Sequence, residues 1–471
     1  MKISFARRTV VQSGAVCTWI ARDRHCHAAA ALGSLTLLVI GGLYADRARA
    51  QDQAAFVSTP SLQPTQQTAQ LIAGLTHTDN FARTGENRAS DTVAVVGTNL
   101  DLHRRGAEVD LQAQGNADFV DYLSHRFGSR VLGFMNGSAL LGAPSDWFQF
   151  SARDTFGQLI EDPFEAVTPE NLEDVNQFSA GPAVNLHLGD STRLTGYGIY
   201  SRTTYQTSPN DSHAITAGAA LARQLSRLST LTLSVSKQNT VFDDPGNSDF
   251  DIGNVELRLD AGTRRTTLAA AIGYTQLKQA GDTSGGPLVL LQASRKVSPF
   301  TTLFINVQRD YATSVDALLA ASGAAPGLTA AVGSSAPLST ATPFRDQVYG
   351  AGFTIDKSRT TLSVTATLRQ EHYSGQNSLN RTLEGLGATL TRRLSPTITA
   401  SLAGELDHGR FDDNSGSDTE YHILASVAKN LTTRLSVSLQ YDRYARSGTG
   451  GFVPYTENQV GARVTYSIIG L

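Results

Sequence analysis

A short polar turn followed by an alternating run of side chains returns at regular intervals, and this period constrains the fold more than any other feature of the chain. The turns are centred near residues 190, 226, 261, 298, 357, 395 and 432, and all spacings but one are 35 to 38 residues. The exception is 59 residues, and its surplus falls between Thr313 and Phe344. Two strands, one short turn and one longer loop fill such a period, so each repeat is expected to be a β-hairpin.

The runs between the turns alternate between apolar and polar side chains. A strand places successive side chains on opposite faces, so each run predicts one apolar wall and one polar wall. In one run the residues expected to face lipid are Ile398, Ala400, Leu402 and Leu406, and those expected to face water are Thr397, Thr399, Ser401, Glu405 and Asp407. A soluble sandwich would alternate too, but it would need a second sheet over its apolar face.

Longer polar segments lie between the short turns, and an aromatic residue precedes each of them. The segments include 206–212, 243–250, 279–286, 374–378, 412–418 and 447–456. Short turns on one side and long loops on the other are typical of an outer-membrane barrel. The aromatic residues are expected to form a girdle at the lipid headgroups. They are Phe81, Phe119, Phe156, Tyr205, Phe242, Tyr274, Tyr311, Tyr373, Phe411 and Tyr444.

Together these patterns predict an all-β fold: a transmembrane antiparallel up-and-down β-barrel of about 18–20 strands, with short periplasmic turns and longer extracellular loops. We expect residues 70–471 to form the barrel in the outer membrane of a Gram-negative bacterium. Residues 51–69 show no strand pattern, which predicts a flexible periplasmic segment or a partial plug. A secreted β-solenoid or sandwich is the alternative fold.

Residues 1–50 differ in composition from the rest of the chain. Basic residues precede an uncharged run from Ala28 to Ala45, and Ala48-Arg49-Ala50 follows. This order predicts a secretory signal peptide cleaved after Ala50, with an uncleaved membrane anchor or twin-arginine export as alternatives. Both cysteines, Cys17 and Cys26, lie in this prefix, so the mature chain is expected to lack disulfides and cysteine-metal sites.

Removing residues 1–50 takes away seven basic and two acidic residues, which leaves 32 basic against 40 acidic residues and a net charge of −8. This charge argues against nucleic acid as a partner. The expected partners are outer-membrane lipid and lipopolysaccharide, the barrel-assembly machinery, and polysaccharide or small hydrophilic solutes in the lumen.

A barrel of this size is too wide for side chains to fill, so its lumen should hold water or a plug. The residues expected to line it are Glu108, Asp110, Gln112, Gln114, Asn116, Asn306, Gln308, Asp310 and Glu405. Amides among a few carboxylates suit neutral or hydrated solutes, although any water-filled wall would have this composition. The insert 317–344 carries no charged residue, and it either folds inward and narrows the channel or forms an external lid.

No catalytic residues, metal site or cofactor are predicted. The sequence lacks G-x-S-x-G and H-E-x-x-H patterns, and its acidic loops, DDPGNSD from Asp243 and DDNSGSD from Asp412, lack the ligand spacing of an EF-hand. A plugged structural or adhesive surface barrel is one alternative function. An outer-membrane hydrolase is another, with Asp407 and His408 as the nearest approach to a catalytic pair.

Two short motifs carry a family resemblance. The first expected strand ends in Thr78-Asp79-Asn80-Phe81, and the second opens at Ser90-Asp91. With the hairpin period, these motifs resemble the β-barrel porin 2 group, the porin-like outer-membrane proteins of bacterial exopolysaccharide clusters, over about residues 70–471. The resemblance implies a role in polysaccharide secretion or the cell envelope, without catalytic residues. The chain departs from barrels that end in an aromatic residue, because Tyr466 is its last one.

Overall fold

The computed structural model describes residues 67–143, 145–322, 336–412 and 416–469, and these residues form twenty strands. None of the helices in these ranges has the length and apolarity needed to cross a bilayer. The predicted signal peptide, the cleavage site at Ala50 and residues 51–66 lie outside the described residues.

The strand and helix bounds follow the predicted hairpin period. In chain order the elements are β1 Gln67–Thr78, β2 Asp91–Arg105, β3 Val109–Tyr122, β4 Arg130–Leu141, β5 Phe148–Ile160, η1 Pro169–Asn171, β6 Leu172–His187, β7 Thr192–Tyr205, β8 Ser212–Ser226, β9 Ser229–Phe242, β10 Phe250–Gly262, β11 Thr266–Gln279, β12 Asp282–Lys296, β13 Thr301–Ala312, α3 Ser314–Ser322, β14 Phe344–Lys357, β15 Thr360–Tyr373, η2 Asn377–Leu379, β16 Arg381–Arg393, β17 Ile398–Phe411, β18 Ser417–Asn430, β19 Leu435–Gly448 and β20 Tyr455–Ile469.

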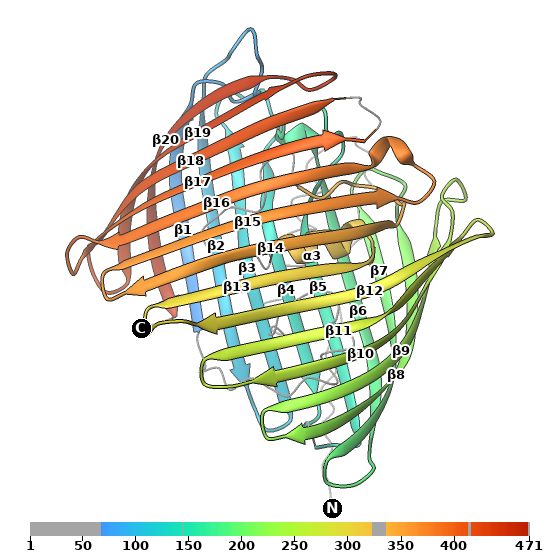
Figure 1. Cartoon of the computed structure of the whole chain (residues 1–471). Coiled ribbons are helices and arrows are strands. Elements are labelled where there is room, and N and C mark those ends of the chain that lie inside the picture. Colours follow the sequence, from blue (N-terminus) through green and yellow to red (C-terminus); the bar gives the residue numbers. More distant parts are fainter. Residues whose placement is uncertain (1–66, 144, 323–335, 413–415, 470–471) are drawn as a thin grey trace, which may run out of the picture.

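The strands form a single closed sheet. Each strand pairs antiparallel with the next, and β1 pairs with β20, so that Leu71 lies opposite Tyr466. The result is an up-and-down barrel, as Figure 1 shows. This confirms the predicted fold and the upper end of the predicted strand number. The first strand begins at Gln67, ahead of the barrel boundary that we expected at residue 70.

The outer surface of the barrel is apolar. In β17, Leu402 and Leu406 are 51% and 47% exposed, whereas Ala403 between them is 4% exposed. Large apolar side chains repeat this exposure around the barrel, at Leu75, Val96, Ile215, Leu233, Val255, Ile272, Ile305, Leu386, Ile423, Leu439 and Val460. Water would disfavour such a continuous apolar surface, whereas lipid solvates it, and the closed sheet leaves no strand edge exposed to hydrocarbon. The protein is therefore a transmembrane barrel of the Gram-negative outer membrane.

The connections differ between the two ends of the barrel. Two residues join β8 to β9 and β14 to β15, whereas the connections at the other end include the much longer segments 79–90, 161–171 and 313–343. The prediction of a long loop at 279–286 is wrong, because only Ala280 and Gly281 separate β11 from β12. Both have positive φ, 51° and 90°, which is the conformation of a tight two-residue hairpin turn.

Candidate functional site

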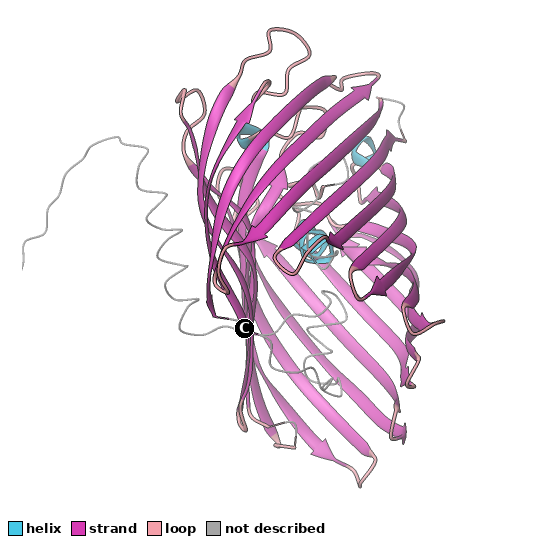
Figure 2. Cartoon of the chain, turned by 90° about the vertical axis from the view of Figure 1, so that its left-hand side faces the viewer, coloured by secondary structure: helices cyan, strands magenta, loops and turns pink. Residues whose placement is uncertain are grey.

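The insert between β13 and β14 enters the barrel. Helix α3 lies within the barrel outline in Figures 1 and 2 and packs on the inner wall. Its residues Val315, Leu318 and Leu319 form a buried apolar cluster with Phe134, Leu159 and Val175, which come from β4, β5 and β6. Of the two possibilities left open by the sequence, the described parts of the insert therefore take the inward one.

A hydrogen-bonded cap starts α3. Thr313 donates its N–H and its hydroxyl to Asp316 Oδ2, both at 2.8 Å, and the Asp316 N–H donates to Thr313 Oγ1 at 3.3 Å. This reciprocal arrangement satisfies backbone donors that a helix start otherwise leaves unpaired. The cap fixes the point at which the chain leaves β13, and the apolar residues of the next turn then face the opposite wall.

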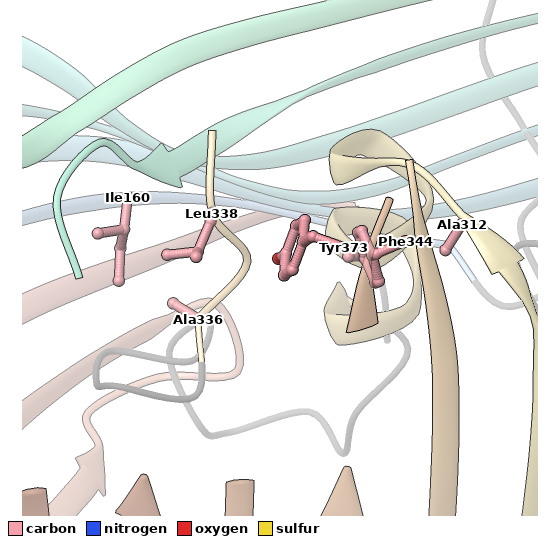
Figure 3. Packing of buried hydrophobic residues seen from close by; sticks show 7 residues of the cluster. Ile160, Ala312, Ala336, Leu338, Phe344 and Tyr373 are labelled. Carbon is pink, nitrogen blue, oxygen red and sulfur yellow. The ribbon is translucent and has the colours of Figure 1, made fainter. Parts of the chain in front are cut away.

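The segment returning from the insert is attached to the end of β5. The Ile160 N–H donates to the Pro337 carbonyl at 3.0 Å, and the Ser339 N–H donates to the Ile160 carbonyl at 2.7 Å. Leu338 and Ile160 form a parallel bridge and belong to the buried cluster of Figure 3, with Ala312, Ala317, Ala336, Phe344 and Tyr373. Backbone pairing and apolar contact together hold this segment across the lumen.

Glu173 on β6 joins three segments at one carboxylate. The residue is 0% exposed, and it accepts hydrogen bonds from the Thr207 N–H at 3.0 Å, the Ser208 hydroxyl at 2.9 Å and the Ser339 hydroxyl. Glu161 lines the same small hollow. Burial, and then the charge of Glu173, raises the pKa of Glu161.

A buried charge network supports the insert from β14, β15 and β16. The Arg381 Nε lies 2.7 Å from Glu371, and the Arg369 Nε lies 2.8 Å from Asp346 and 3.1 Å from Glu371. Arg381 also donates to the Ala336 carbonyl at 3.0 Å. Two guanidinium groups thus balance two carboxylates, and one of them binds the returning segment directly.

The loop between β5 and β6 crosses the mouth of the barrel. Arg446 of β19 pairs with Asp418 at 2.8 Å and donates to the carbonyls of Glu165 at 2.6 Å and Pro163 at 2.7 Å. Phe164, from the same loop, stacks on Phe411 with ring centroids 4.9 Å apart. The loop therefore starts on one part of the wall and is fixed to another, on β17 to β19.

Arg83, from the loop between β1 and β2, provides a second attachment for the β5–β6 loop. Its Nε lies 2.8 Å from Glu457, its Nη1 donates to the Val167 carbonyl at 2.8 Å, and its guanidinium lies 4.4 Å from the centre of the Tyr444 ring. Burial acts to lower the pKa of Arg83, but the neighbouring Tyr455 and Glu457 outweigh it and hold this pKa above its ordinary value. The cation thus stays charged although it is buried.

Most residues predicted to line the lumen lie on strands β3, β13 and β17, on the face opposite the exposed apolar residues. On β13, the side chain of Asn306 lies on the face opposite to those of Leu303 and Ile305, which are each 45% exposed. On β17, Glu405 lies opposite His422 of β18. Glu108 is different, because it lies in the turn between β2 and β3. The other predicted residues on these faces are Asp110, Gln112, Gln114, Asn116, Gln308 and Asp310.

The predicted aromatic girdle divides between the two faces of the wall. Phe119 and Tyr274 are 41% and 55% exposed on the outer surface. The girdle prediction is wrong for Phe81, Tyr373, Phe411 and Tyr444, which are buried within the protein. An aromatic residue at the end of a strand can point to either face, and these four pack against the loops that enter the barrel or cover its mouth.

The remaining aromatic residues of the predicted girdle are partly buried against other side chains. Tyr205 packs against the α3 cluster, and Phe242 and Tyr311 pack against the cluster of Phe250, Ile252 and Leu277. Phe156 lies opposite Met135 in the β4–β5 ladder. The positions of these four side chains are therefore set by packing within the protein.

Asp407 and His408 do not form a catalytic pair. They are successive residues of β17, so their side chains lie on opposite faces of the wall, and the His408 ring lies 3.0 Å from the Thr419 hydroxyl. Across the described ranges, no group of three or more histidine, cysteine, aspartate or glutamate side chains is arranged to hold a metal ion. Asp243, in one of the acidic loops, binds Arg202 at 2.6 Å, and this hydrogen bond is the main reason that its pKa is lowered.

The sequence did not indicate the residues that attach the loops. Arg446, Arg83 and Glu173 contact partners far away in the chain, such as Glu165 for Arg446 and Ser339 for Glu173. The available signal was a charged residue near the end of a strand, beside a loop. That signal occurs at many positions in the chain, so it does not select these three.

No family model and no curated protein matches the chain. Solved structures with a similar fold include the siderophore receptors PirA from Pseudomonas aeruginosa and from Acinetobacter baumannii, at 12% and 9% identity and TM-scores of 0.43 and 0.46, each covering 87% of this chain and 81% of that chain. The FrpB iron transporter from Neisseria meningitidis has 9% identity and a TM-score of 0.42, and the match covers 86% of this chain and 83% of that chain. Similarity at this level assigns neither cargo nor mechanism. Membership of the β-barrel porin 2 group stays a prediction.

Proposed function

We propose that the protein is a porin-like channel for small hydrophilic solutes, narrowed in its outer half by α3 and the β5–β6 loop. The observation that carries the proposal is the attachment of α3 to the inner wall of a barrel too wide for its own side chains to fill. A loop held inside a wide barrel restricts the size of the solutes that pass.

The inner wall suggests the solute class. On β9, Thr232, Ser234 and Ser236 face the lumen while Leu233 and Val235 face lipid. Hydroxyl side chains recur on the inner faces of β15 and β16, at Ser363, Thr365, Thr367, Thr389 and Thr391. Hydroxyl and amide groups exchange hydrogen bonds with water and with sugar hydroxyls at little net free energy, which favours neutral hydroxylated solutes.

An association with exopolysaccharide secretion is the finer part of the proposal, and it rests on the resemblance to the β-barrel porin 2 group. It is tested separately from the channel, by deleting the gene and measuring secreted polysaccharide. Unchanged secretion would remove this association and leave a general porin. Glycosyltransferase genes beside this gene would support the association.

The channel is tested by planar-bilayer recording of the purified barrel and by liposome uptake of neutral sugars. We expect discrete conductance steps, faster uptake of monosaccharides than of trisaccharides, and larger steps in the Val315→Asp/Leu318→Asp variant, because charged side chains would release α3 from its apolar cluster. Gln376→Asp, at an exposed loop position, provides the control. Absence of conductance in both the wild type and the variant would contradict the channel and favour a plugged structural barrel.

A further inference from the structure

The wall of the barrel has an incomplete ladder between β12 and β13. Their pairing runs from Lys296 opposite Thr302 to Val289 opposite Arg309 and ends there, whereas β12 continues to pair with β11 up to Asp282. The outer part of β12 and the end of β13 therefore form a seam. A hydrogen bond of 2.8 Å between the hydroxyls of Tyr311 and Ser284 spans this seam.

Three basic side chains gather beside the seam. Arg309 lies at the end of the ladder, and a Cβ on Gly286 of β12 would lie 3.5 Å from its Nη2. On the neighbouring strands, Arg345 lies opposite Tyr311 and also opposite His372. Each of the three lies on the outward face of its strand, at an even spacing from an outward apolar or aromatic residue. Arg309 is on β13 with Ile305, Arg345 is on β14 with Tyr349, and His372 is on β15 with Leu368.

Three nitrogen atoms of these basic groups have no acceptor within the described part of the chain. The Nε of Arg309, the Nε of Arg345 and the Nδ1 of His372 are buried without a hydrogen-bond partner. Among the described residues neither guanidinium makes an ion pair, and the carboxylate nearest to His372 is that of Asp412, at 4.0 Å. Buried donors of this kind ordinarily have partners, so the cluster is electrostatically incomplete.

A second incomplete ladder shows how the protein closes such a seam with its own side chains. Pairing of β4 with β5 ends at Met135 opposite Phe156. There Gln158 accepts the Gly133 N–H at 2.8 Å, and Arg130 binds Asp174 at 2.9 Å and the Leu172 carbonyl at 3.1 Å. The β4–β5 seam is thus satisfied internally, whereas three buried nitrogens beside the β12–β13 seam have no acceptor among the described residues.

The position of the cluster identifies the chemistry of that ligand. Tyr349 and Ile305, directly below it on the outer face, are 43% and 45% exposed and face lipid. The cluster lies toward the long-loop end, where the outer leaflet has its headgroups. Guanidinium groups bind phosphate through charge-assisted hydrogen bonds. We propose that Arg309, Arg345 and His372 bind the phosphate group of an outer-leaflet glycolipid whose acyl chains lie along β13 and β14.

The test uses native mass spectrometry of the full barrel in detergent, with three probes: diphosphorylated lipid A, dephosphorylated lipid A and inorganic phosphate. The diphosphorylated lipid should bind the wild type at least about ten-fold more tightly than the dephosphorylated form, and Arg309→Gln/Arg345→Gln should remove this preference. The matched control is Lys237→Gln, which removes an outward cation already paired with Asp251 at 2.9 Å. Retained heat-modifiable migration verifies that each variant is folded.

Each probe has an outcome that would overturn the proposal. Equal binding of the two lipid A forms would show that phosphate is not recognised, and full binding by the double variant would show that these arginines are not the site. If inorganic phosphate occupies the site as tightly as the phosphorylated lipid, the ligand is a free anion and the lipid assignment is wrong. A loss of the same size in Lys237→Gln would indicate only general surface charge.

Discussion

The β5–β6 loop, which crosses the mouth of the barrel, and helix α3, which lies inside it, are held by opposite kinds of interaction. The β5–β6 loop is held by guanidinium groups, since Arg446 and Arg83 donate to its carbonyls at Pro163, Glu165 and Val167. Helix α3, in the β13–β14 insert, is held by apolar contact through its own side chains. Directional charged bonds fail together when one partner is lost, whereas apolar contacts weaken by degrees. A single substitution should therefore release the β5–β6 loop in one step, whereas it should only weaken the docking of α3. We call these the abrupt and the graded attachment.

The largest expected effect is from Arg446→Ala, which would leave Asp418 buried without its cation and free the loop carbonyls of Pro163, Phe164 and Glu165. We expect the loop attachment to weaken by about 4 kcal/mol. A glutamate-specific protease should then cleave after Glu165 faster than in the wild type, where Arg446 binds the Glu165 carbonyl. Arg443→Ala, on the outward face of the same strand, should leave protection unchanged. A loop that stays resistant in Arg446→Ala would show that this clamp is dispensable.

Leu318→Ala tests the graded attachment. Loss of a buried leucine side chain should destabilise α3 docking by about 3 kcal/mol. Ala317 is 1% exposed in the wild type, so the rate of thiol labelling in an Ala317→Cys variant measures how often α3 leaves the wall. This rate should increase by about 100-fold when Leu318→Ala is added. Leu303→Ala, on the lipid face, is the control. Equal labelling rates in both backgrounds would contradict an apolar attachment.

Glu173→Gln addresses a buried carboxylate that joins the insert to the β7–β8 loop. The substitution keeps the shape of the side chain but removes its negative charge, so the hydroxyls of Ser208 and Ser339 lose a charged acceptor. We expect the attachment of the insert to the β7–β8 loop to weaken by about 2 kcal/mol. Amide exchange at Ser208 should accelerate, and the pKa of Glu161 should fall because a neighbouring negative charge is removed. Glu170→Gln, exposed in η1, should change neither quantity.

The smallest effect is expected at Gly157, beneath α3. A Cβ there would lie 2.9 Å from Leu318 Cδ2, the flexible end of a side chain, so Gly157→Ala should cost about 1 kcal/mol of docking. Labelling at position 317 should accelerate by about five-fold. Gly198→Ala, where a Cβ meets no atom within 4 Å, is the control. If Gly157→Ala accelerated labelling as much as Leu318→Ala, the Leu318 side chain would be unable to move aside for the added methyl group.

The barrel itself was predictable because its information is local. Alternation from Ile398 to Asp407 specifies a strand with one lipid face, and turns such as 394–397 recur where strands end. The predicted loop at 279–286 failed because the φ preference of Ala280 and Gly281 supports a tight turn, which polarity alone does not reveal.

The loop attachments were not predictable for the opposite reason. Arg446 binds the carbonyl of Glu165, 281 positions earlier in the chain, and a carbonyl carries no residue-specific signal. The aromatic residues show the same limit: Phe411 and Tyr274 both precede a turn or loop, yet Phe411 is buried and Tyr274 is exposed. Whether such a residue meets lipid or protein depends on its parity within the strand and on which loop folds over it.

The pairing of β1 with β20 has a consequence for biogenesis. Leu71 and Tyr466 can meet only after every intervening hairpin has been synthesised and exported, so the cylinder cannot close while the chain is still emerging from the inner membrane. Until that last ladder forms, β1 and β20 each expose a row of unsatisfied amides and carbonyls that another chain could capture. Formation of the β1–β20 ladder is therefore the step that removes the last open strand edges of the sheet.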